Sequence, residues 1–141
     1  MKSKYYMFVL FVWCLLVNES SYCIAEAKKK AESVVYGVTI VAMDAPLRAT
    51  IGRKVFVEVL IGNERTTKVT TILTVTCPTT KQQIGREAET LDSLSSQKIV
   101  YSWNTEGLKE GTYVLRAELQ KVSDETVIDD NVRQVEILLE R

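Results

Sequence analysis

Carboxylates gather near the end of the chain in a pattern that could serve a metal ion. Asp124, Glu125, Asp129 and Asp130 fall close together, and Ca²⁺ takes roughly six to eight oxygen ligands. Their spacing matches no EF-hand loop, and a solvated turn between strands, fixed by Asp130 or Asn131, is the commoner use of such residues. We expect no bound metal and retain these four carboxylates as a weak calcium candidate.

Nucleophilic chemistry lacks its usual partners. Histidine is absent from the 141 residues, which excludes Ser-His and Cys-His pairs and His-based metal cages. Cys77 has no histidine to activate it, and it shares a strand face with Leu73 and Val75, so we expect a small buried side chain. The 18 basic and 18 acidic residues cancel, whereas a nucleic-acid binder needs a basic surface. These features predict a protein that is not an enzyme, has no cofactor and does not bind nucleic acid.

Two aromatic residues could form a sugar-binding platform or belong to the core. Trp103 and Tyr113 both lie on the apolar face of their segments, which favours the core. Tyr113 then suits a tyrosine corner, in which the hydroxyl bonds to an upstream backbone group.

Three apolar residues lie on the opposite, polar phase of their segments. Phe56 and Leu60 flank Glu58, and Leu138 follows Glu136. Apolar side chains on a face that should be wet can form a contact surface. We treat Phe56, Leu60 and Leu138 as a candidate partner patch.

The elements that position these residues are strands. Apolar and polar residues alternate with period two, which is typical of half-buried strands in antiparallel sheets; the segments are 34–43, 54–61, 69–77, 97–103, 112–120 and 132–139. Residues 82–96 are the least regular, and we expect a short edge strand at 83–86 followed by a loop. The pattern predicts an all-β chain over 34–141, an antiparallel immunoglobulin-like β-sandwich of about seven strands. Its expected core is Val57, Val59, Leu73, Val75, Tyr101, Trp103, Leu115 and Ile137.

The first 27 residues resemble an export signal rather than part of the fold. Two lysines precede the apolar run Met7–Val17, and small residues follow, which is the order of a secretory signal peptide. A helix of 11 residues spans only about 16 Å, too short for a hydrocarbon core of ~30 Å. We therefore expect a signal-peptide helix in 1–27, a flexible lead-in at 28–33, and no stable membrane span after cleavage.

The processing of this leader stays open. Cleavage after Ala27 or after Ala25 both fit the small-residue rule, Cys23 could carry a lipid, and the run could remain as an anchor. Each outcome places the protein in the same compartment class: secreted, periplasmic or on the cell surface. Removal of the leader leaves Cys77 without an intrachain partner.

Five motifs follow one another in a set order along the chain: Gly52 before the second strand, Asn63 after it, Tyr101-Ser102-Trp103, Gly111-Thr112-Tyr113, and the turn Asp129-Asp130-Asn131. This ordered set resembles the CARDB-like domains, bacterial immunoglobulin-like modules named for a relation to cell adhesion. The resemblance implies an exported β-sandwich used for binding or spacing.

The expected function is therefore a non-catalytic module in adhesion or protein–protein interaction at the cell envelope. Its partner would be another envelope protein or a surface polymer. Two alternatives remain, a periplasmic chaperone or carrier that offers a strand edge, and an accessory subunit of an envelope enzyme.

Overall fold

A computed structural model describes residues 33–141. The expected signal-peptide helix and nearly all of the expected lead-in lie outside these residues. Within them, no helix is long and apolar enough to cross a membrane.

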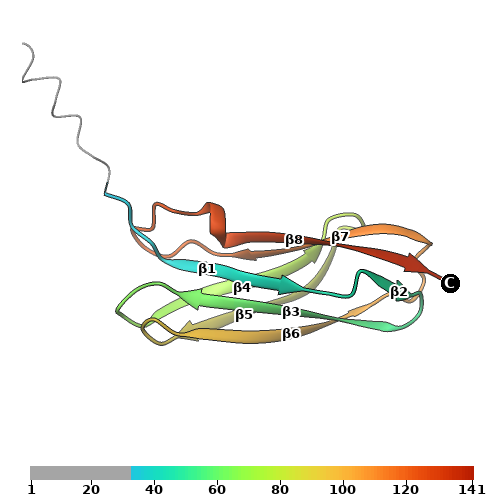
Figure 1. Cartoon of the computed structure of the whole chain (residues 1–141), viewed down its shortest axis with the longest axis horizontal. Helices are drawn as coiled ribbons and strands as arrows, with labels where there is room; N and C mark the ends of the chain where they lie inside the picture. The colour runs from blue at the N-terminus through green and yellow to red at the C-terminus, as the bar shows by residue number, and fades with distance from the viewer. Residues whose placement is uncertain (1–32) are drawn as a thin grey trace, which may run out of the picture. The chain divides into compact units, whose positions relative to one another are not determined.

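Two sheets stack face to face in Val34–Arg141 (Figure 1). The three-stranded sheet has the order β1-β3-β6, formed by Val38–Asp44, Lys54–Asn63 and Ser96–Asn104. The five-stranded sheet has the order β2-β8-β7-β4-β5, formed by Arg48–Thr50, Val132–Glu140, Gly111–Leu119, Val69–Cys77 and Gln82–Leu91. A short 3₁₀ turn, η1 (Asp129–Asn131), precedes β8. The predicted all-β sandwich is confirmed.

The strand pairs are antiparallel with one exception. The three-residue β2 runs parallel to β8, with Arg48 opposite Leu138. The chain leaves β1 in one sheet and enters β2 in the other through Ala45-Pro46-Leu47. A single segment therefore borders both sheets along the same side of the sandwich.

Three strands differ from the sequence prediction. β1 begins at Val38, four residues after the predicted start at 34, because Val35 bonds to Thr126 of the β7–β8 loop instead of to β3. β2 falls between turn-forming residues and is too short to show a period. β5 spans ten residues, whereas we expected a short strand at 83–86 followed by a loop. Most of its side chains are exposed, so its sequence lacks the alternation that indicates a strand. β5 is held in place by backbone pairing with β4 along its whole length. Because backbone hydrogen bonds do not depend on side-chain type, the strand needs little apolar alternation in its sequence.

The core lies between the sheets and contains every residue expected there. Val57, Val59, Leu73, Val75, Tyr101, Trp103, Leu115 and Ile137 are all buried. Alternation in β3, β4, β6, β7 and β8 directs these side chains to a common interior.

Side chains close the open side of the sandwich, where β5 and β6 are both edge strands. Trp103 Nε1 donates to Gln82 Oε1 at 3.2 Å, and Gln97 Nε2 donates to Glu89 Oε2 at 3.0 Å. Between these two bonds the Tyr101 ring covers Gly85, where a Cβ atom would come within 2.2 Å of the ring. Only glycine leaves room for the ring at this point.

Replacing Tyr101 by phenylalanine should leave the free energy of unfolding unchanged or slightly raised at neutral pH. The buried hydroxyl of Tyr101 makes no hydrogen bond of good geometry, so its removal leaves no partner unsatisfied. Burial, and then the nearby carboxylates of Glu87 and Glu89, raise the pKa of Tyr101.

In the native state Tyr101 keeps its proton to a higher pH than it does in the unfolded chain. The free energy of unfolding is therefore unaffected by this difference only while the tyrosine is neutral in both states. Stability therefore falls as pH rises above the unfolded value of about 10. Urea unfolding at neutral and at alkaline pH should show a smaller alkaline loss for Tyr101→Phe than for the wild type. An equal loss in both proteins would contradict this assignment.

Candidate functional site

The acidic turn between β7 and β8 separates its carboxylates instead of gathering them. Glu125 is only 1% exposed, so the expectation of a solvated side chain is wrong for this residue. Asp124 and Asp129 are exposed, and Asp130 is half-buried. Among residues 33–141, no group of three or more Asp, Glu, Cys or His side chains is placed to hold a metal ion.

Three N–H donors surround the Glu125 carboxylate. Its Oε1 accepts from the Val38 backbone N–H at 2.9 Å. Its Oε2 accepts from the Val122 N–H at 3.1 Å and from Asn131 Nδ2 at 3.0 Å. Donors from three segments thus satisfy a buried charge. We call Glu125 with these three donors the carboxylate socket.

The socket joins the beginning of β1 to the β7–β8 loop. Gly37 is required beside it, because a Cβ atom there would lie 2.3 Å from Glu125 Oε1. Thr126 N–H donates to the Val35 carbonyl at 2.9 Å, and Val35 N–H donates to Thr126 Oγ1 at 2.8 Å. Arg65 adds bonds to the Tyr36 and Ser123 carbonyls. Glu125 therefore has a structural role, which its sequence neighbours did not indicate.

Calcium should not raise the melting temperature of this protein. Specific binding at a hundredfold excess over Kd would add about 2.7 kcal/mol, a shift of several degrees for a domain of this size. The turn offers too few converging oxygens for such binding. The measurement compares melts in millimolar Ca²⁺ and in chelator at matched ionic strength. A rise that an Asp129→Ala, Asp130→Ala double variant abolishes would contradict this prediction.

The aromatic pair belongs to the core. Trp103 is fully buried and Tyr113 is 8% exposed, with ring centroids 5.7 Å apart and planes at 59°. The Tyr113 hydroxyl donates to the Lys109 carbonyl at 2.9 Å and accepts from the Lys109 N–H at 3.2 Å. This is the tyrosine corner expected from the sequence. Neither ring is available as a sugar platform.

Cys77 is completely buried at the end of β4. The expected small core residue is confirmed. A thiol without exposure has no access to a second chain or to an oxidant.

The candidate partner patch divides between the two sheets. Phe56 and Leu60 lie on β3 in the three-stranded sheet, whereas Leu138 lies on β8 in the other. Since their neighbours in sequence face the common core, the outward residues of the two sheets point in opposite directions. Leu138 therefore does not join Phe56 and Leu60 in one patch.

Other apolar side chains join Phe56 and Leu60 on the outer face of the three-stranded sheet. Val100 is opposite Glu58 in the β3–β6 register, diagonal to both Phe56 and Leu60. Val41 falls at an irregularity in β1, and its Cγ2 lies 3.2 Å from where a Cβ on Gly62 would be. We call Val41, Leu60, Val100 and Phe56 the apolar stripe. Sequence reasoning missed Val41 and Val100, because only the strand register places them beside the other two.

The stripe is accessible to a partner. Phe56 is 61% exposed, Val100 52% and Val41 46%, while Leu60 is half-buried. Glu58 lies between Phe56 and Leu60 on β3 and forms an ion pair at 2.7 Å with Lys98 of β6. The hydrogen bond and charge of Glu58, with a smaller effect of Asp44, raise the pKa of Lys98.

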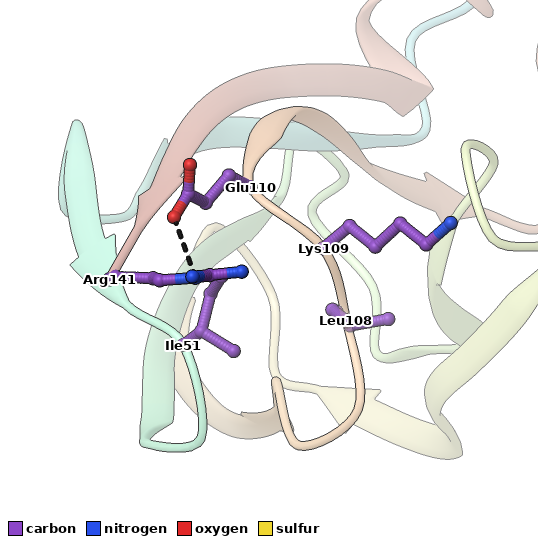
Figure 2. Close-up of a pocket in the computed structure, with 5 residues that line it drawn as sticks. All are labelled: Ile51, Leu108, Lys109, Glu110 and Arg141. Carbon is purple, nitrogen blue, oxygen red and sulfur yellow. Dashed lines mark ion pairs between the residues drawn. The ribbon is translucent and has the colours of Figure 1, made fainter.

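A shallow hollow of about 440 Å³ lies at the end of the sandwich where β8 ends (Figure 2). It is lined by Ile51, Leu108, Lys109, Glu110 and Arg141. Arg141 Nε and Glu110 Oε1 pair at 2.9 Å, with the arginine side chain 90% exposed. Long exposed side chains form much of the wall, and the charged ones are Lys109, Glu110 and Arg141.

Comparisons with known proteins give likeness in structure alone. No family model matches the sequence, and no curated protein matches it. The CARDB domain of the PF1109 protein from Pyrococcus furiosus, crystallised with di-metal ions, aligns with a TM-score of 0.63 at 16% identity. The alignment covers 72% of this chain and 91% of that domain.

Similar sandwiches occur inside larger enzymes. A β-glucosidase from Erythrobacter marinus aligns with a TM-score of 0.61 at 13% identity, over 74% of this chain but 15% of the enzyme. The alkylpurine DNA glycosylase AlkC from Pseudomonas fluorescens, solved with DNA, aligns at 0.56 and 11% identity, over 75% of this chain and 31% of the glycosylase. At these identities the likeness concerns the fold.

Proposed function

From the CARDB-like fold of residues 34–141, we propose that this protein is an exported, non-catalytic binding or structural module of the cell envelope. It acts in adhesion or protein–protein interaction. The observation that carries the proposal is the apolar stripe, Val41, Leu60, Val100 and Phe56, on the outer face of the three-stranded sheet.

The stripe is more than scattered surface residues. Single exposed apolar side chains are normal, but contiguous ones with a polar border mark contact surfaces. Here four apolar residues lie on three neighbouring strands, with the Glu58–Lys98 pair among them. A large exposed ring such as Phe56 is also the residue type that anchors protein interfaces.

A non-catalytic role is supported by the chemistry that the chain offers. The sequence lacks histidine, Cys77 is buried, and Trp103 and Tyr113 are used in packing. The similar P. furiosus domain holds two metal ions, whereas the acidic turn of this chain gives its best-placed carboxylate, Glu125, to N–H donors. A protein contact thus accounts better for the exposed residues than a reaction does.

Export is supported by the leader. The basic start, the apolar run Met7–Val17 and the small residues before Lys28 form a secretory signal. Adhesion and interaction at the envelope follow from that location together with the exposed stripe.

The test is chemical crosslinking of the full chain in its native envelope, followed by affinity capture. Phe56→Glu should lose the captured partner, because a carboxylate cannot be buried in an apolar contact. Leu47→Glu is the matched control, since Leu47 is 83% exposed and lies outside the stripe. Equal capture with both variants, or a hydrolytic activity in the pure protein and no partner, would contradict the proposal.

The alternative of an offered strand edge finds little support. β5 carries a register irregularity beside Gly85 and the charged residues Arg86, Glu87 and Glu89, features that protect an edge from pairing. On the other side of the sandwich, Arg133 Nε donates to the Ile40 carbonyl of the edge strand β1 at 2.7 Å. This bond occupies an acceptor that a partner strand would otherwise use.

A further inference from the structure

We propose that the outer face of the three-stranded sheet binds the same face of a second copy of this chain, forming a weak, reversible two-fold dimer. The inference rests on the proposed function and names its partner.

The face has the shape that sheet-to-sheet packing uses. Residues opposite one another in β1, β3 and β6 point to the same side, and the inward set of β3, including Val57 and Val59, already fills the core. The outward set presents the apolar stripe across all three strands. Two such faces can pack about 10 Å apart with their strands nearly aligned, as the two sheets of a sandwich do.

The charges on this face are balanced and are interspersed with the apolar stripe. Asp44 and Glu58 face each other across β1 and β3, while Lys54 and Lys98 supply two ammonium groups from β3 and β6. A partner of opposite net charge would call for a face of one sign. A face with both signs in equal number is instead complementary to a rotated copy of itself.

A two-fold axis makes this complementarity specific. In such an interface, residue i contacts residue j of the other copy and residue j contacts residue i. An axis in the interface between Glu58 and Lys98 brings the carboxylate of each copy to the ammonium group of the other. The apolar stripes then meet beside these two equivalent ion pairs.

The size of the face makes the dimer weak. Three strands about 4.8 Å apart and about nine residues long present roughly 400 Å² per copy. The roughly 800 Å² that two copies bury is below the 1,200–2,000 Å² or so of stable complexes. The purified protein should therefore be monomeric when dilute, and tethering many copies to one surface would favour pairing through a high local concentration.

Sedimentation equilibrium of the full chain, from micromolar to millimolar concentration, tests the inference. The wild type should show a reversible monomer–dimer equilibrium. Phe56→Glu should raise the dissociation constant at least tenfold, and the control Leu47→Glu should leave it unchanged. Thermal melts of each variant establish that its fold is intact.

Charge reversal separates self-association from other contacts. Glu58→Lys and Lys98→Glu should each associate at least tenfold more weakly than the wild type, because each puts like charges together in the dimer. An equimolar mixture of the two variants should recover the association, since their faces are opposite in sign. The double variant Glu58→Lys, Lys98→Glu should also recover it.

Three results would overturn the inference. They are a wild type that stays monomeric at millimolar concentration, a dimer that Phe56→Glu does not weaken, and a mixture of single-charge variants that fails to associate. If crosslinking in the envelope still depends on Phe56, the proposed function stands with a different protein as partner. If that dependence is also absent, both proposals fail.

Discussion

Replacing Trp103 by alanine should lower the free energy of unfolding by about 3–5 kcal/mol. The indole is fully buried and packs against the Tyr113 ring at 5.7 Å, so its removal leaves a cavity and ends an aromatic contact. The loss is a large part of the roughly 5–15 kcal/mol that stabilises a native domain. Urea denaturation of wild type and variant measures it.

Trp103→Phe is the matched control, because it keeps an aromatic ring in the cavity. It should cost clearly less than alanine, with the remainder due to lost volume and to the bond from Nε1 to Gln82. A loss under about 1 kcal/mol for Trp103→Ala would be the cost of an exposed residue. That outcome would make the Trp103 ring a candidate binding platform.

Replacing Glu125 by alanine should destabilise the protein by a similar amount, about 3–5 kcal/mol. The substitution leaves the N–H groups of Val38 and Val122 and the amide of Asn131 without the acceptor they share. Each unsatisfied buried group costs about 1–3 kcal/mol. Asp129→Ala, a nearby exposed carboxylate, should change stability by only about 0.5 kcal/mol.

Hydrogen exchange distinguishes this loss from a general weakening of the fold. The amides of Val38 and Val122 should lose protection before those in the centre of β4, because the socket holds only the β1 end and the β7–β8 loop. Glu125→Gln, which keeps one acceptor oxygen, should fall between wild type and alanine. If Glu125→Ala proves no worse than Asp129→Ala, the socket does not stabilise the fold.

The sequence predicts strands well where their side chains alternate between core and solvent. β3, β4, β6, β7 and β8 are such strands, and the structure places each within one or two residues of the predicted bounds. Only the first part of β5 is predicted, as a short edge strand at 83–86, because most side chains of the full strand are exposed. Its backbone hydrogen bonds to β4 depend on a partner distant in the chain, and its own residues do not reveal them.

Site residues were harder to predict than strands. From the sequence, Glu125 is predicted to be a carboxylate on the surface. Its burial depends on hydrogen-bond donors from Val38 and Asn131, which only the folded chain brings together. Leu138 shares its off-phase character with Phe56, yet phase along a strand does not tell to which sheet the strand belongs. The strand register shows that Val41 and Val100 belong to the apolar stripe, which the sequence alone does not show.

The positions of the two chain ends determine how a pulling force acts on the sandwich. The chain enters at the end where Val35 bonds to Thr126 and leaves at the other end, after Glu140 has bonded to Ile51 (Figure 1). A pull on these two ends acts along the strands, at right angles to the hydrogen bonds that join β1 to β3. Such a load shears many bonds together instead of opening them one by one. The sandwich can therefore transmit tension along its length, from Val35 at one end to Glu140 at the other.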